Sequence, residues 1–215
     1  TYGDWSSDVC SSDLSDNNER INFITVSPSD KYVAMCERGE RALVTIYNIT
    51  SRDKRNRVKQ IPDGHNVDRD FPELHGVQEF LAAAFSPKDE HRLFTLVGDP
   101  AWSLLLWHWT EGQASKILSR VDLTNRELLK SVFDGSTSLS SSFMMSLYLQ
   151  GVDLFVTVTG PDLFQFFKIL PENNAFDPKH TKLNHIAGKK VQHSTQYACH
   201  IWTKDAQLVV ATEQG

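Results

Sequence analysis

Serine and threonine are concentrated between residues 134 and 150, so a hydroxyl nucleophile is the first chemistry to consider in this chain. A serine nucleophile needs either a sharp turn that exposes its hydroxyl group or a base positioned to accept its proton. The serine-rich stretch contains no Gly-x-Ser-x-Gly pattern and no histidine. We therefore expect no catalytic serine in this stretch.

Metal-binding side chains are present, but their spacing does not fit a site. Asp63, Asp68 and Asp70 lack the glycine and the terminal glutamate of a calcium-binding loop. His91 and His108 have no second histidine or carboxylate at the spacing of a zinc site. The chain also has no His-Glu-x-x-His, no phosphate-binding glycine loop and no Cys-x-x-Cys. These patterns predict no catalytic residue, no metal, no cofactor and no enzymatic activity.

A cluster of basic side chains offers electrostatic binding instead. Its members are Arg52, Lys54, Arg55, Arg57 and Lys59. One interpretation is an interaction loop for an anionic partner, such as an acidic tubulin tail or a nucleic acid. The simpler interpretation is a solvated connection between two strands. A second connection, residues 171–192, is also rich in lysine and histidine and has the same two interpretations.

The composition and net charge of the chain restrict the kinds of molecule that it is expected to bind. The chain has 215 residues, of which 40% are hydrophobic and 23% charged, as is typical of a globular protein. The net charge of −5 predicts no nucleic-acid partner, and the lack of an 18-residue apolar run predicts no membrane span. Cys10, Cys36 and Cys199 show no paired spacing, which favours a reducing compartment such as the cytoplasm. We expect protein partners and no small-molecule substrate.

The elements that must position these side chains are strands. In the middle of the chain, a period of two residues predicts short strands that end at Phe85, span 92–97 and span 103–109. A Ser-Pro-Lys-Asp turn follows the first strand and a Gly-Asp-Pro break follows the second. Residues 116–121 add a fourth, outer strand. The pattern predicts an antiparallel sheet of consecutive strands.

The same unit occurs earlier in the chain. Residues 21–49 repeat the order of strand, Ser-Pro-x-Asp turn, strand, glycine turn and strand. The interval from Pro28 to Tyr47 is 19 positions, and the interval from Pro87 to Trp107 is 20. Two matched units with nearly equal spacing indicate a repeat architecture.

These units resemble the repeats of the WD-repeat β-propeller family, whose blades are four-stranded antiparallel sheets. Tyr47-Asn48 and Trp107-His108 stand where that family has Trp-Asp, so the repeats are divergent. The resemblance implies an all-β fold, a partial WD-repeat β-propeller. It also implies that Trp102, Trp107 and Trp109 pack between blades rather than form a stacking surface for bases or sugars.

The rest of the chain supplies further blades. Residues 152–169 predict a third unit, and 197–215 predict the first half of a fourth. Between blades, 125–133 predict a short helical turn, and 134–150 interrupt the repeat as a degenerate unit or as non-native sequence. Because about three and a half blades cannot close a ring of 4–8 blades, we expect 15–215 to be an incomplete propeller domain from a longer chain.

The first 14 residues do not share the strand pattern. Residues 8–14 read Asp-Val-Cys-Ser-Ser-Asp-Leu, which looks like the translation of a sequencing-library adapter. We interpret residues 1–14 as a non-native or disordered tail and exclude them from the fold.

Four stretches read together are similar to the propeller region of the WD-repeat proteins of the motile-cilium axoneme: 24–32, 80–87, 156–160 with 166–167, and 199–202 with 212–215. Such proteins join propellers to a long coiled coil on doublet microtubules near the dynein arms. The resemblance implies a non-catalytic interaction scaffold of the cytoplasm, cytoskeleton and ciliary or flagellar axoneme, which contributes to the assembly or regulation of dynein-driven motility. Its implied partners are dynein-associated or microtubule-associated proteins. Two alternatives stay open: a WD-repeat adaptor of another cytoplasmic or nuclear complex, and the propeller domain of a peptidase-type enzyme.

Overall fold

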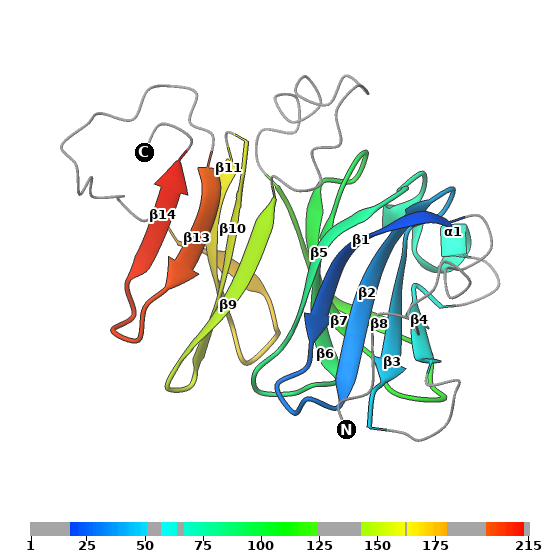
Figure 1. The fold of residues 1–215 in the computed structure, drawn as a ribbon, viewed down its shortest axis with the longest axis horizontal. Helices are drawn as coiled ribbons and strands as arrows, with labels where there is room; N and C mark the ends of the chain where they lie inside the picture. Colours follow the sequence, from blue (N-terminus) through cyan, green and yellow to red (C-terminus); the bar gives the residue numbers. More distant parts are fainter. Residues whose placement is uncertain are drawn as a thin grey trace, which may run out of the picture.

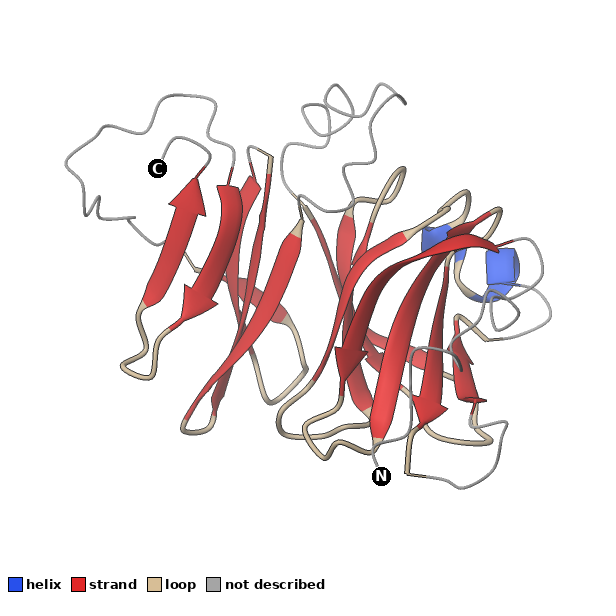
Figure 2. Ribbon diagram, in the orientation of Figure 1, coloured by secondary structure: helices blue, strands red, loops and turns tan. Residues whose placement is uncertain are grey.

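The computed structural model describes residues 18–50, 57–63, 67–123, 143–161, 163–179 and 197–212. Their strands form three four-stranded antiparallel sheets and one two-stranded sheet, which stand side by side in chain order (Figure 1). We call the four-stranded sheets blades A, B and C, and the two-stranded sheet half-blade D. Regular structure in the described residues is almost entirely β, as Figure 2 shows.

Neighbouring strands in each sheet are also neighbours in the chain. Blade A contains β1 (Asn18–Val26), β2 (Tyr32–Gly39), β3 (Leu43–Asn48) and β4 (Arg57–Ile61); blade B contains β5 (Phe80–Phe85), β6 (Arg92–Val97), β7 (Ser103–His108) and β8 (Lys116–Asp122); blade C contains β9 (Met144–Gln150), β10 (Asp153–Gly160), β11 (Leu163–Ile169) and β12 (Phe176–Pro178); half-blade D contains β13 (Tyr197–Trp202) and β14 (Leu208–Thr212). The one-turn helix α1 (Val67–Asp70) and the 3-10 turn η2 (Pro72–Leu74) lie between blades A and B. No helix in the described residues is long and apolar enough to span a membrane.

The Ser-Pro turns form where the sequence predicts them. The Ser27 hydroxyl oxygen accepts a hydrogen bond from the Tyr32 amide at 3.0 Å, so this side chain closes the turn between β1 and β2. At the matching place between β5 and β6, the Ser86 hydroxyl oxygen accepts a hydrogen bond from the Lys88 amide at 3.3 Å. Both serines are buried, so each turn is fixed at the end of its blade.

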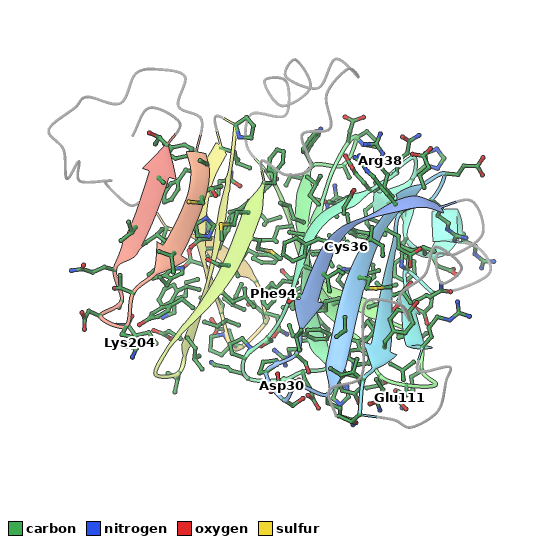
Figure 3. The ribbon with its side chains drawn as sticks, in the orientation of Figure 1. Asp30, Cys36, Arg38, Phe94, Glu111 and Lys204 are labelled. Carbon is green, nitrogen blue, oxygen red and sulfur yellow. The ribbon has the colours of Figure 1, made fainter. Side chains whose placement is uncertain are left out.

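The hydrophobic core is divided into two layers. One layer lies between blades A and B, and the other between blades B and C; we call them the A/B seam and the B/C seam. In β6, Leu93 belongs to the A/B seam and Phe94 to the B/C seam, because successive side chains of a strand point to opposite faces. Cys36 lies in the first layer and Phe94 in the second (Figure 3). Blade B is therefore buried on both faces, which explains why its strands are nearly continuous apolar runs.

Two stretches differ from the sequence-based expectation. Residues 57–61, expected within a polar connection, form the outer strand β4, because Ile61 is fully buried against the A/B seam. Residues 144–150, expected within the interruption of the repeat, form the inner strand β9, where Met145 enters the B/C seam. The serine-rich sequence that precedes this strand obscured the alternation of side chains that predicts a strand. Residues 1–14, 125–133 and 134–142 lie outside the described residues.

Candidate interaction site and the contacts between blades

The basic cluster predicted from the sequence is divided by the fold. Arg57, at the start of β4, is exposed. Lys59 points inward: its side chain is only 8% exposed, and its ammonium group contacts the Asp63 carboxylate and donates to the Gln113 carbonyl oxygen. Arg52, Lys54 and Arg55 lie outside the described residues. Lys59 is therefore a structural side chain, whereas Arg57 remains available to a partner.

Asp63 links blade A to blade B. Its Oδ1 accepts a hydrogen bond from the Ser115 amide at 2.9 Å and a second from the Ser115 hydroxyl, and its Oδ2 pairs with Lys59. Burial alone would raise the pKa of the Asp63 carboxyl, but the hydrogen bonds from Lys59 and Ser115 outweigh it and leave the pKa lowered. The carboxylate considered above as a metal ligand thus accepts hydrogen bonds in a Lys59–Asp63–Ser115 cluster.

Aromatic side chains fill the A/B seam. The Trp109 ring lies edge-on to Tyr32, with centroids 5.0 Å apart, and 5.2 Å from the ring of His91. Trp107 packs 5.4 Å from Phe71, and its indole N–H donates to the Thr95 hydroxyl oxygen at 2.9 Å. Both tryptophans are fully buried, which confirms that they pack between blades.

One end of the A/B seam carries a polar cluster. The Asn22 amide donates to Glu79 Oε2 at 3.0 Å, and the guanidinium of Arg38, which is labelled in Figure 3, lies 3.6 Å from the same oxygen. Arg38 and Glu79 also form a backbone bridge between the two blades. These contacts fix how β2 and the start of β5 are aligned.

The B/C seam also combines aromatic and aliphatic side chains. Trp102 is fully buried there, 5.7 Å from Phe143, which again agrees with packing between blades. Phe143 presses on Gly160: a Cβ added to that glycine would lie 2.5 Å from the ring. Any larger residue at position 160 would therefore displace the Phe143 ring, which packs against Trp102.

The contact between blade C and half-blade D combines stacked rings with a buried polar group: the Trp202 ring stacks on Tyr148, with centroids 4.6 Å apart. His200 is 2% exposed, and its Nε2 lies 2.6 Å from the Ser146 hydroxyl while its Nδ1 lies 2.7 Å from the Thr159 hydroxyl. We call these three residues the His200 bridge. Beside it, the Trp202 indole N–H donates to the Thr157 hydroxyl oxygen at 3.1 Å. The sequence analysis did not identify this site, although the alternation of His200 and Trp202 shows that both face blade C.

A hydroxyl beside a histidine whose second nitrogen is held by another group is the arrangement of an activated nucleophile. The His200 bridge has this geometry, but its electrostatics do not suit general-base catalysis. Burial lowers the pKa of His200 to about 4, well below the near-neutral value that suits a general base. With the imidazole also shielded from solvent, the arrangement is suited to holding two blades together.

No sequence profile of a known protein family matches the chain. No curated protein sequence matches it either. Solved structures do match in three dimensions. The chain is similar to the β-propeller domain of Nup133 from Vanderwaltozyma polyspora, with a TM-score of 0.58 and 12% identity over 94% of this chain and 55% of that one.

Two further solved structures have a comparable likeness. One is a chain of a mitotic checkpoint complex, with a TM-score of 0.52 and 13% identity over 91% of this chain and 47% of that one. The other is a putative 6-phosphogluconolactonase from Bacteroides uniformis, with a TM-score of 0.53 and 9% identity over 91% of this chain and 48% of that one. The chain spans about half the length of each of these structures. At these identities the likeness concerns the fold alone, and it confirms the expected fold: an all-β, partial β-propeller, here with three four-stranded blades and one two-stranded sheet.

Proposed function

We propose that the chain is a non-catalytic protein-interaction scaffold of the ciliary or flagellar axoneme, where it contributes to the assembly or regulation of dynein-driven motility. The observation that supports a scaffold is the packing of three consecutive blades through two buried apolar seams. A packed stack of sheets presents its turns and strand ends in fixed positions, which suits recognition of other proteins. One of the structures with a similar fold is a chain of a mitotic checkpoint complex, which supports a role in a multiprotein assembly.

The axonemal part of the proposal rests on the sequence resemblance. The four stretches named above are similar to the N-terminal propeller of cilia- and flagella-associated protein 57. That resemblance places the candidate partners among dynein-associated and microtubule-associated proteins. Localisation to the cytoskeleton and axoneme follows from the same argument and is part of the proposal.

The contact to a partner is assigned to the basic cluster on blade A. Arg57 is exposed and is the first residue of β4, the outer strand of blade A. We propose that Arg57, with Arg52, Lys54 and Arg55, binds an acidic segment of a protein. Lys59 takes no part in binding, because its ammonium group is held by Asp63 and Gln113.

A binding experiment tests this assignment. Fluorescence anisotropy would compare a glutamate-rich peptide with a glutamine-rich peptide of equal length, at low and at physiological salt. Replacing Arg52, Lys54, Arg55 and Arg57 by serine should abolish salt-sensitive binding, because these side chains supply the attraction. Lys59→Met is the matched control and should bind as the unchanged protein does. Equal binding of both peptides would contradict the proposal.

Cell fractionation tests the axonemal part. A tagged chain expressed in motile ciliated cells should remain with detergent-extracted axonemes. Recovery only in the detergent-soluble fraction would favour the alternative, a WD-repeat adaptor of another cytoplasmic or nuclear complex. The Nup133 and checkpoint neighbours are the observations that keep this alternative open. The peptidase-type enzyme is the weaker alternative, and a serine-directed activity probe that labels Ser146 would support it.

A further inference from the structure

Two arginines face each other across the first two strands of blade A. In the register of β1 and β2, Arg20 is the direct partner of Arg38. Direct partners in an antiparallel pair point to the same face of the sheet, so like charges at these positions repel each other and weaken the pairing of the strands. The stability of this arginine pair therefore depends on the negatively charged acceptors around it.

Among the described residues, Glu79 is the only carboxylate that pairs with either arginine. Its Oε2 lies 3.6 Å from Arg38 Nη1 and also accepts a hydrogen bond from the Asn22 amide at 3.0 Å. Gly98 holds Glu79 in place: its amide donates to the Glu79 carbonyl oxygen at 3.2 Å, and a Cβ at Gly98 would lie 3.0 Å from Glu79 Cγ. One fixed carboxylate is thus set against two positive charges.

Both guanidinium groups keep unused donors, because each has five N–H groups in a planar fork. Arg20 donates through Nε to the Asn22 side-chain oxygen at 3.1 Å, but its Nη2 is buried and has no hydrogen-bond partner among the described residues. Arg38 lies too far from Glu79 for a hydrogen bond, since 3.6 Å exceeds the usual limit. A buried charged donor without an acceptor is costly, so the pair lacks an acceptor that carries negative charge.

Solvent reaches the arginine pair. The Arg38 side chain is 35% exposed, and Arg20 is half-buried. Figure 3 shows Arg38 at the end of blade A opposite to the end at which Asp30 is labelled. Glu37 does not supply the missing acceptor, because successive side chains of a strand point to opposite faces and its carboxylate accepts a hydrogen bond from the Thr45 hydroxyl at 2.5 Å.

We propose that Arg20 and Arg38 form a binding site for an oxyanion, which is either the carboxylate of an acidic side chain or a phosphate group. The planar fork of a guanidinium matches the paired oxygens of both groups and donates two parallel hydrogen bonds to them. The bound anion satisfies the buried Nη2 of Arg20 and offsets the repulsion between β1 and β2. The site is separate from the basic cluster that leads into β4, and the proposal does not depend on the function proposed above.

Isothermal titration calorimetry on the 215-residue chain tests the proposal. Sodium phosphate and sodium acetate are titrated separately, with sodium chloride at equal ionic strength as the reference. We expect saturable binding of at least one oxyanion, together with a shift of the Arg20 Nε resonance in the nitrogen-15 spectrum. A preference for phosphate would assign the ligand as a phosphate group, and a preference for acetate would assign it as a carboxylate. Heats equal to those with chloride would overturn the proposal.

A matched pair of variants locates the site. Arg20→Gln removes the fork with the unpartnered Nη2 and should weaken binding of the anion at least about tenfold. Arg41→Gln makes the same change at an exposed arginine in the turn between β2 and β3, and should leave binding unchanged. Circular dichroism verifies that both variants keep their strands. Equal weakening in the two variants would reduce the effect to net charge and contradict a site at Arg20.

Thermal unfolding separates a binding role of Arg20 from a purely structural one. In chloride buffer, Arg20→Gln should unfold at or above the temperature of the unchanged protein, because the pair of like charges is gone. The anion that binds should raise the unfolding temperature of the unchanged protein but not of the variant, since a ligand stabilises only the state that binds it. A variant that is less stable in chloride and gains the same increase with the anion would show a structural residue and overturn the proposal.

Discussion

The A/B seam and the contact between blade C and half-blade D both contain packed rings, but the second also buries a histidine. The A/B seam is closed by rings, with Tyr32, Trp107 and Trp109 all buried. In β13, His200 is buried and meets blade C through hydroxyl groups, beside the Trp202 ring that stacks 4.6 Å from Tyr148. Apolar burial depends on area and little on pH or direction, whereas a buried histidine depends on hydrogen-bond geometry and on its charge.

The difference teaches which contact is robust and which is conditional. Truncating a buried tryptophan to alanine costs roughly 3–5 kcal/mol of stability, because the buried apolar area and the packing contacts of the ring are lost. A hydrogen bond between neutral groups contributes only about 0.5–1.5 kcal/mol net, but leaving a buried polar partner without it costs about 1–3 kcal/mol. We therefore expect half-blade D to loosen before blades A and B separate.

The largest effect should follow from breaking the A/B seam. Trp109→Ala removes a fully buried ring that contacts Tyr32 and His91, and should lower the free energy of unfolding by about 3–5 kcal/mol. Urea unfolding followed by circular dichroism measures the change. Trp109→Phe is the control: its cost should be clearly smaller, because it keeps a ring and removes an indole N–H that has no partner among the described residues. Equal losses in the two variants would contradict a packing role.

The second effect concerns pH and half-blade D. Because the folded pKa of His200, about 4, lies below its unfolded value of 6.5, the unfolded chain binds more protons between these values. The contribution of neutral His200 to the stability of the fold is thus complete above about pH 6.5 and is lost as pH falls toward 4. The total loss is up to about 3 kcal/mol.

Hydrogen exchange of β13 and β14 amides at pH values between 7 and 4.5, corrected for intrinsic rates, measures this loss locally. His200→Gln should remove the pH dependence, because glutamine does not titrate in this range. Asp63 cannot produce the same effect, since its folded pKa is lowered from 3.8 and its contribution is lost only below that value. A pH dependence retained in the glutamine variant would place the titrating group elsewhere.

A smaller effect is expected from the hydroxyl groups of the His200 bridge. Thr159→Val keeps the shape of the side chain and removes the oxygen that lies 2.7 Å from His200 Nδ1. The expected loss is about 1–2 kcal/mol, confined to half-blade D. Thr25→Val, on the inner strand β1, is a control for the substitution itself. The local exchange rates of β13 distinguish the two: only Thr159→Val should raise them.

The smallest effect should separate Lys59 from Arg57. Lys59→Met breaks the contacts to Asp63 and Gln113 and should cost about 1 kcal/mol, since the pair is partly exposed at Asp63. Arg57→Gln changes an exposed strand end and should stay within about 0.5 kcal/mol of the unchanged protein. Thermal unfolding of both variants compares them directly. The reverse order would show that Lys59, not Arg57, is the free basic side chain.

Much of blade B could be predicted from local sequence. The limits of β5 and β6 match the expected strands, and β7 ends one residue before the expected position, because Ser-Pro and Gly-Asp-Pro turns punctuate an alternating pattern. The inner strand β9 was not predicted, because its flanking serines carry no turn signal of that kind. The outer strand β4 was not predicted either, because a half-exposed strand with two basic residues resembles a loop.

The candidate sites show a different limit of prediction from the sequence. The sequence identified Arg57 and Lys59 as one basic cluster, but their opposite environments depend on Asp63 and on a turn of the next blade. His200 has contacts 41 and 54 positions away in the chain. A local sequence pattern cannot predict contacts between residues so far apart in the chain, because these contacts depend on the angle and spacing at which one blade stacks on the next.

By itself, the sequence determined the repeat, the strand alternation and the Ser-Pro turns, since these depend on backbone preferences and on which residues avoid water. It also determined that Trp102, Trp107 and Trp109 would be buried, because large rings in alternating sequences pack between sheets. The stacking of the blades decided the rest: which lysine turns inward and which histidine loses its charge. Those properties depend on the electrostatics and geometry of groups that meet only after the blades have packed.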